Sequence, residues 1–156
     1  MKNIVTLIII LPLLFYCDYS LAQKKTISAE VNFVEESAGT ITVRSIGYGK
    51  NKIEAVDNAE INAMDVLLFR GVSESSQKDP LIITNSEDVK AKNQEYFNNF
   101  YNGKQFKTFI SSAIPTTKDV IKNKGGMKSI AVDIKINIKA LKMNLEQNNI
   151  IRKFGF

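Results

Sequence analysis

The chain of 156 residues contains no histidine and no tryptophan, and its single cysteine is Cys17. Serine and cysteine hydrolases usually need a histidine as the base that activates the nucleophile. Zinc sites likewise draw their ligands mainly from histidine and cysteine. These absences exclude the commonest catalytic triads and the usual zinc sites, so carboxylate and lysine chemistry are the remaining routes to catalysis.

The first 22 residues have the pattern of a secretory signal peptide. Lys2 supplies a positive start, an apolar run of about 13 residues follows, and Ser20 and Ala22 occupy the −3 and −1 positions of a cleavage site. The run is shorter than the roughly 20 residues that a membrane-spanning helix needs, which disfavours a retained anchor. We therefore expect residues 1–22 to be removed, and residues 23–156 to work outside the cytoplasm, in the periplasm or after secretion.

Cys17 offers an alternative fate for the N-terminus. A bacterial lipoprotein signal places small residues before the cysteine that receives the lipid, whereas Phe15 and Tyr16 precede this one. Lipidation would anchor the chain at a membrane. Removal of Cys17 with the signal peptide is the favoured interpretation. It leaves no cysteine, so no disulfide could form within the processed chain even in an oxidising compartment.

Basic residues outnumber acidic ones by 21 to 16, which gives a net charge of +5. An excess of lysine favours anionic partners such as lipid head groups, nucleic acid or acidic glycans. The lysines are scattered, however, and no basic stripe carries interleaved aromatic residues. We interpret the charge as a solvated surface and expect no nucleic-acid partner.

Alternating apolar and polar residues predict the strands. Thr26–Val34 and Thr40–Ile46 alternate on either side of a turn that contains Gly39, so we expect them to form a hairpin. Met127–Lys139 alternates aliphatic with charged or polar residues, which is typical of an antiparallel sheet covered on one face only. Asn123–Gly126 before it predicts a second hairpin turn.

Helical spacing predicts two main helices and a short third one. The first extends from Asn51, its N-cap, to Arg70, before the stop at Gly71, and it carries a stripe of alanines four residues apart. The main apolar series of this helix is Ile53, Val56, Ala59 or Glu60, Ala63 and Val66–Leu67, and the alanine stripe is a second, smaller one. The small alanines should let the helix lie close against a sheet.

The rest of the chain is less regular. The second helix begins at Asn85 or Ser86 and ends at Gly103, and Phe106–Ile114 follows as a strand. A brief apolar patch at Leu81–Ile83 indicates a short strand. The short C-terminal helix is expected at Ala140–Gln147. The apolar tail after it is expected to be docked.

Together these elements predict a single α+β domain in residues 23–156. We expect one antiparallel sheet of four or five strands, with the two main helices packed on one face and a short C-terminal helix. Strands precede and follow the helices without alternating with them, which disfavours a parallel α/β sheet.

Gly47 and Gly49 lie between a strand and a helix, where phosphate-binding loops also occur. The third glycine of a dinucleotide fingerprint is missing, and no Lys-Ser or Lys-Thr pair follows as in a Walker A loop. We therefore interpret the two glycines as the structural exit of a strand.

The acids of the first helix, Glu54, Asp57, Glu60 and Asp65, could serve as paired carboxylates for acid–base chemistry. Nothing nearby in sequence would raise their pKa values, so a solvated helix face is the favoured interpretation.

Four aromatic residues lie close together in the second helix, at Tyr96, Phe97, Phe100 and Tyr101. Such a group forms either a ligand-stacking surface or a cap on the core. We favour the core.

Several stretches resemble known proteins. Thr42–Gly49, the alanine-spaced helix with Leu67–Gly71, and the ending Ile150–Gly155 together resemble a group of small exported gram-negative envelope proteins of unassigned function. More loosely, the strand, glycine pair and alanine-rich helix are similar to the twenty-kilodalton membrane-associated lipoprotein family. That family includes surface and flagellum-associated proteins with a helix on an antiparallel sheet. The residues before Cys17 depart from its lipid-attachment signal, and neither resemblance implies a catalytic residue.

We therefore predict a non-enzymatic exported protein with a binding or assembly role in the periplasm or at the outer membrane. Its expected partners are other envelope proteins or the outer-membrane surface, a homo-oligomer is an open alternative, and no catalytic residue, metal or cofactor is assigned. A second hypothesis is an exported domain that holds a small apolar or anionic ligand near Tyr96–Tyr101. A third is an enzyme that uses carboxylates such as Glu35, Glu36 or Glu60.

Overall fold

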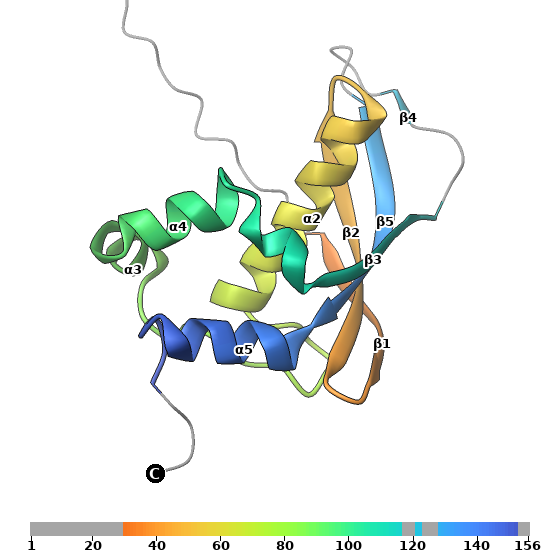
Figure 1. The fold of residues 1–156 in the computed structure, drawn as a ribbon. Coiled ribbons are helices and arrows are strands. Elements are labelled where there is room, and N and C mark those ends of the chain that lie inside the picture. The colour runs from red at the N-terminus through yellow and green to blue at the C-terminus, as the bar shows by residue number, and fades with distance from the viewer. Residues whose placement is uncertain (1–29, 117–120, 123–127, 153–156) are drawn as a thin grey trace, which may run out of the picture.

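The computed structural model describes residues 30–116, 121–122 and 128–152 (Figure 1). The expected signal peptide, Cys17, the turn at Asn123–Gly126 and the last four residues of the tail lie outside these ranges. In chain order the elements are β1 (Val31–Ser37), β2 (Thr40–Gly49), α2 (Lys52–Phe69), α3 (Ser86–Lys92), α4 (Gln94–Tyr101), the 3-10 helix η2 (Gln105–Phe109), β3 (Ile110–Pro115), β4 (Ile121–Lys122), β5 (Lys128–Asn137) and α5 (Ile138–Gln147).

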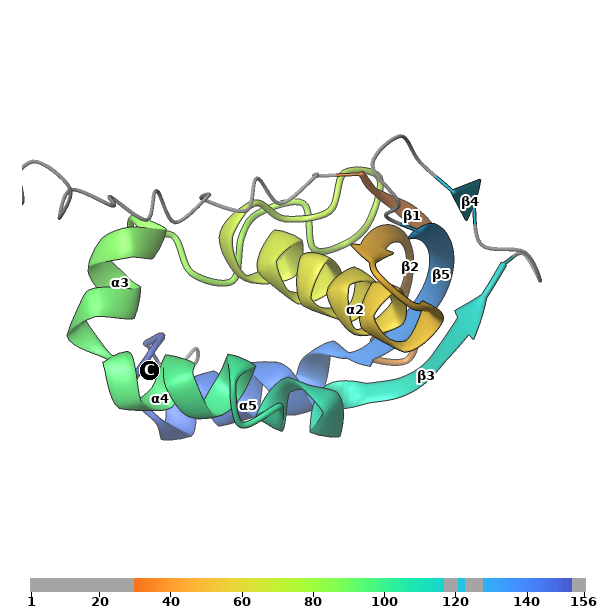
Figure 2. The same cartoon turned by 90° about the horizontal axis from the view of Figure 1, so that it is seen from above.

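The strands form one antiparallel sheet in the order β1-β2-β5-β3, and β4 also pairs with β5. At its centre β2 and β5 pair without a register shift, from Thr40 opposite Asn137 to Gly49 opposite Lys128. All the labelled helices lie on the same side of the sheet, as the view from above shows (Figure 2). The predicted α+β fold, with one antiparallel sheet covered on one face, is confirmed.

The core lies between α2 and the central strands. On the helix side of the sheet the aliphatic residues are fully or almost fully buried: Ile41, Val43, Ile130, Val132, Ile134 and Ile136. Ala55, Ala59 and Ala63 of α2 have no exposed surface, whereas Ile53 is 77% exposed. The alanine stripe therefore faces the sheet as predicted, and the apolar stripe that begins at Ile53 does not begin in the core.

Gly47 and Gly49 of β2 let α2 come this close. A Cβ atom on Gly47 would lie 2.0 Å from the Ala55 carbonyl oxygen and 2.4 Å from the Ala59 nitrogen. On Gly49 it would lie 2.5 Å from the Ala55 nitrogen. The helix backbone thus fills the space in front of both glycines, so their role is close helix–strand packing.

The ends of α2 follow from local sequence. Asn51 accepts a hydrogen bond from the Glu54 nitrogen at 2.9 Å, and the Glu54 carboxylate accepts one from the Lys50 nitrogen at 2.8 Å. This is a variant of the capping box. At the other end Gly71 has φ +79°, and its nitrogen donates to the Val66 carbonyl at 2.8 Å. Both predicted ends of the helix are confirmed.

Two asparagines of α2 also bind the edge of β2. The Tyr48 nitrogen donates to the Asn58 side chain at 2.9 Å, and the Asn62 side chain donates to the Ile46 carbonyl at 2.9 Å. Strand β1 pairs with β2 only as far as Ser45. Side chains four residues apart on the helix therefore satisfy backbone groups beyond the end of β1.

The predicted second helix is divided into α3 and α4 at Asn93. The ψ angle of Asn93 is 45°, which lies outside the helical range, and the Asn93 side-chain amide donates to the Val89 carbonyl at 3.0 Å. Such local side-chain bonds compete with the helix ladder. Tyr96 of α4 donates to Asn144 of α5 at 2.8 Å, so α4 lies beside α5 on the helix side of the sheet.

The predicted strand Phe106–Ile114 begins with the 3-10 helix η2 and becomes β3 only at Ile110. Phe106 and Phe109 are 1% and 7% exposed. A 3-10 helix has three residues per turn and places both rings on one side, whereas a strand would point them in opposite directions.

Leu81–Ile83 is not a strand either. The nitrogens of Leu81 and Ile82 donate to the carbonyls of Leu67 and Leu68, at 3.1 and 2.8 Å. This segment therefore caps the C-terminal end of α2, where carbonyl groups lack helical partners.

The C-terminal part matches the sequence more closely. Helix α5 begins two residues before the predicted start, so Ile138 belongs to the helix and not to the preceding strand. Leu141 and Leu145 are fully buried, and Ile150 and Ile151 pack against the core. The described part of the tail is docked as predicted.

Both outer strands of the sheet path are irregular. Strand β1 has a register shift at Val34, and β3 has one at Ser111 and ends at Pro115. The β1–β2 turn consists of Ala38 and Gly39, with φ of 45° and 83°, as in a type I′ hairpin. Bulges and proline at edge strands hinder pairing with another chain.

Candidate functional site

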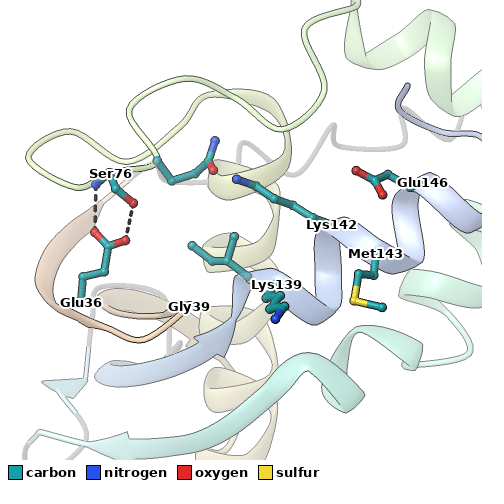
Figure 3. Close-up of a pocket in the computed structure, with 9 residues that line it drawn as sticks. Glu36, Gly39, Ser76, Lys139, Lys142, Met143 and Glu146 are labelled. Atoms are coloured by element: carbon teal, nitrogen blue, oxygen red, sulfur yellow. Dashed lines mark hydrogen bonds between the residues drawn. The ribbon is translucent and has the colours of Figure 1, made fainter. Parts of the chain in front are cut away.

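A pocket of about 380 Å³ opens beside α5 (Figure 3). Three segments that are distant in sequence line it: the β1–β2 hairpin, the loop of residues 72–79, and one side of α5 from Ile138 to Glu146. Its lining residues are Glu36, Gly39, Ser76, Gln77, Ile138, Lys139, Lys142, Met143 and Glu146.

Backbone contacts hold the hairpin and α5 in place. The Lys139 nitrogen donates to the Gly39 carbonyl at 3.3 Å. Asn137 caps α5 by accepting a hydrogen bond from the Ala140 nitrogen at 2.9 Å. The helix therefore begins directly at the end of β5, next to the hairpin turn, which places Lys142 and Met143 one turn further along.

The 72–79 loop is folded around Ser75. Its hydroxyl donates to the Val72 carbonyl at 2.7 Å and accepts from the Gln77 nitrogen at 3.0 Å. Ser75 and Gln77 are only 4% and 9% exposed. These bonds fix the loop so that Ser76 faces the hairpin.

Ser76 binds Glu36 through two hydrogen bonds. The Ser76 nitrogen donates to Glu36 Oε2 at 2.9 Å, and the Ser76 hydroxyl donates to Glu36 Oε1. Hydrogen bonds from the Ser76 side chain, and then from its backbone, lower the pKa of Glu36, and the nearby charge of Lys142 also lowers it. Both carboxylate oxygens of Glu36 are thus occupied, which makes this acid a link between the hairpin and the loop.

We expect the contribution of Glu36 to stability to disappear in acid. Because its folded pKa lies below the ordinary value of 4.5, this contribution is complete above that value and is lost as the pH falls through the folded pKa. The difference in unfolding free energy between the wild type and Glu36→Gln should therefore be constant at neutral pH and shrink as the pH falls below 4.5. Urea unfolding at several pH values measures it.

Ser76→Ala provides the control for this titration. It removes the hydroxyl donor and leaves the carboxylate in place, so adding Glu36→Gln to it should produce a smaller pH-dependent difference. A difference between the wild type and Glu36→Gln that is the same at neutral pH and in strong acid would contradict the assignment.

The structure does not bring the three candidate catalytic acids together. Glu35 accepts a hydrogen bond from the Thr42 hydroxyl at 3.3 Å, Glu36 faces Ser76, and Glu60 lies on α2 against η2. In the described part of the chain, no group of three or more acids or other metal-binding side chains is arranged to hold a metal ion.

The prediction of a solvated acidic face on α2 is wrong for Glu60, which is 6% exposed. Lys107 of η2 lies 2.9 Å from the Glu60 carboxylate and 2.6 Å from that of Asp57. Burial raises the pKa of Asp57, but hydrogen bonds from Lys104 and Lys107 outweigh it and hold the value below the ordinary range. The partners come from a segment some 50 residues later, which local sequence could not indicate.

The aromatic group of α4 belongs to the core, as predicted. Phe97 and Phe100 are 5% and 0% exposed, and Phe100 contacts the rings of Phe106 and Phe109 at centroid distances of 6.2 Å. Tyr101 donates its hydroxyl hydrogen bond to Asp65.

The other polar side chains near the aromatic residues of α4 also have interaction partners within the protein. Lys90 lies 4.5 Å from the centre of the Phe69 ring and 3.6 Å from the Asp65 carboxylate. Burial raises the pKa of Tyr96 to about 12. The rings and the nearby lysine thus have partners within the protein.

A second exposed feature is the side of the sheet that faces away from the helices, here called the outer face. At its centre Arg44 of β2 makes a two-pronged ion pair with Asp133 of β5, at 2.8 and 2.9 Å. Ile114 of β3 pairs opposite Asp133 and is 63% exposed. The outer face also includes Thr42, Ile46, Tyr48, Ala131 and Lys135.

Sequence reasoning did not find the pocket. No predicted helix or strand covers residues 72–79, and the predicted C-terminal helix, Ala140–Gln147, carries no candidate site residue. Glu36, Ser76 and Lys142 are separated by 40 residues or more, and no motif joins them. The pairing of β2 with β5 places the start of α5 beside the hairpin, and the loop after α2 brings Ser76 to Glu36.

Comparisons of the chain with protein families, with curated proteins and with solved structures found no match. Among the residues that the structure describes, no helix combines the length and the apolar character needed to cross a membrane.

Proposed function

We propose that the chain is a non-enzymatic exported protein that binds or assembles with other proteins of the cell envelope, in the periplasm or at the outer membrane. The signal-peptide pattern of residues 1–22 supports export. The observation that carries the binding role is the outer face of the sheet, which no helix among the described residues covers (Figure 2).

The composition of the outer face suits contact with a protein. Arg44 and Asp133 neutralise each other at its centre, and their two-pronged geometry fixes the two side chains relative to each other. Ile114 is exposed on one side of this pair, and Ile46 and Ala131 pair with each other two residues further along the two strands. Apolar side chains around a neutralised pair resemble the centre of a protein interface.

The irregular edge strands of the sheet favour a partner that binds to the outer face over one that adds a further strand. The bulges at Val34 and Ser111 and the proline at position 115 hinder the addition of a further strand along β1 or β3. A partner that lies across the outer face meets none of these obstacles.

The test is capture of partners from envelopes of the native host with the tagged full-length protein. We expect the wild type to enrich a partner, and Ile114→Glu, which places a charge on the outer face, to lose it. Ile53→Glu is the matched control, because it makes the same change at an isoleucine that is 77% exposed on α2, on the covered side of the sheet. Circular dichroism of both variants checks that they fold.

Two outcomes would count against the proposal: a monomeric protein that captures nothing, or partner loss with Ile53→Glu and not with Ile114→Glu. The intact mass of the recovered protein tests its export. A soluble form that begins at Gln23 supports cleavage after Ala22, whereas an acylated form that begins at Cys17 would make it an anchored lipoprotein.

A second candidate function is an exported domain that binds a small ligand. The pocket beside α5 favours it, whereas the aromatic group of α4 does not, since its rings pack on one another.

A further inference from the structure

The pocket beside α5 combines an apolar wall with a half-buried lysine, Lys142, that forms no ion pair with the residues that the structure describes. We propose that it binds a small organic monocarboxylate, with the carboxylate at Lys142 and the apolar part of the ligand against Ile138 and Met143. This inference belongs to the second candidate function and is independent of any partner on the outer face.

Lys142 is the group that selects an anion. It is half-buried and extends from α5 toward the loop that carries Ser76 (Figure 3). It makes no hydrogen bond or ion pair with the residues that the structure describes, whereas Lys107, also half-buried, has two carboxylates within 2.9 Å. A partly desolvated ammonium gains most from a partner of opposite charge, which a bound carboxylate would supply.

Glu36, the acid whose pKa is lowered by the charge of Lys142, is already engaged. Glu36 accepts hydrogen bonds from Ser76 at both of its oxygens, and these bonds hold it against the 72–79 loop. Lys142 acts on Glu36 only through its electric field, which lowers the pKa of that acid. The ammonium thus remains available to a ligand, and the exposed Lys139 at the rim adds attraction for anions.

The acids of the wall favour a single negative charge. Glu36 and Glu146 line the same pocket as the two lysines, so the formal charges of the lining balance. A phosphate or sulfate dianion would be repelled by both acids, whereas a monocarboxylate can contact Lys142 with less repulsion.

The other end of the ligand should be apolar and short. Ile138 is 7% exposed and forms a fixed surface, while Met143 is 50% exposed and has a flexible thioether that adapts to different shapes. A volume of about 380 Å³ is at the lower end of the range for ligand pockets. A short aliphatic or amino-acid-like carboxylate therefore fits better than a long-chain lipid.

Calorimetric titration of the purified protein with hexanoate tests the proposal, with hexylamine and inorganic phosphate as comparison probes. We expect saturable binding of hexanoate, and Lys142→Gln should weaken it by about tenfold or more. Lys135→Gln is the matched control, since it removes the same charge from the outer face and should change affinity by less than about twofold. Thermal unfolding confirms that both variants are folded.

Three results would overturn the proposal: no saturable binding of hexanoate, equal binding of hexylamine or phosphate, or an affinity that Lys142→Gln leaves unchanged in a folded protein. A failure of this kind would leave the assembly function intact, because Ile114 and the outer face lie on the other side of the sheet.

Discussion

Replacing Gly47 with alanine should lower the free energy of unfolding by about 3–5 kcal/mol or prevent folding. The added methyl would lie 2.0 Å from the Ala55 carbonyl oxygen and 2.4 Å from the Ala59 nitrogen. Both are backbone atoms of α2, so no side chain can rotate to make room. The helix would have to move away from the sheet, and Ala55, Ala59 and Ala63 would lose their contacts with it. Urea unfolding followed by circular dichroism measures the loss.

Ser45→Ala is the control for this experiment. Ser45 precedes Gly47 by two residues on the same strand and the same face and is fully buried. Its hydroxyl has no hydrogen-bond partner in the described part of the chain. Removing an unpaired buried hydroxyl should leave stability unchanged or raise it by up to about 1 kcal/mol. A Gly47→Ala protein as stable as the wild type would show that α2 does not need this close approach.

Phe100→Ala should lower the free energy of unfolding by about 3–5 kcal/mol. Phe100 is fully buried, and its ring centre lies 5.1 Å from that of Tyr101 and 5.8 Å from that of Tyr96. It also contacts both phenylalanines of η2, so its removal leaves a cavity where α4 meets η2. Few neighbours can move into this space, because the surrounding rings hold one another in place.

Phe33→Ala is the matched substitution. Phe33 lies on the outer strand β1 and is only partly buried against the core, so the same deletion should cost clearly less. Urea unfolding of the two variants side by side measures the contrast. Equal losses would mean that the aromatic cluster of α4 contributes no more than a peripheral ring.

The parts of the fold that the sequence predicted well are those that local patterns determine. The alternation in β2 and β5 sets which residues face the helices, and Asn51 and Gly71 set the ends of α2 through their own hydrogen bonds and dihedral angles. The close approach of α2 also followed from small residues at helical spacing. In each case the causes lie within a few residues of the effect.

The parts that it missed depend on contacts between distant segments. Phe106 and Phe109 lie in a predicted strand, but both rings contact Phe100 of α4, which local sequence could not indicate. From its sequence context Glu60 is expected to be a surface acid. In the structure Lys107 lies against its carboxylate. The pocket needs Glu36, Ser76 and Lys142 together, and these residues come from the first, middle and last thirds of the chain.

The pairing of β2 with β5 also determines when the chain can fold. Arg44 and Asp133 are 89 residues apart in sequence, yet they lie side by side at the centre of the sheet. Contacts of such long range make folding slow, because a large loop must close before the core forms. The segment up to Phe69 can form the β1–β2 hairpin and α2, but without β5 it lacks the other half of the surface on which α2 packs. Folding of the whole domain therefore has to wait for β5, the last strand that the structure describes.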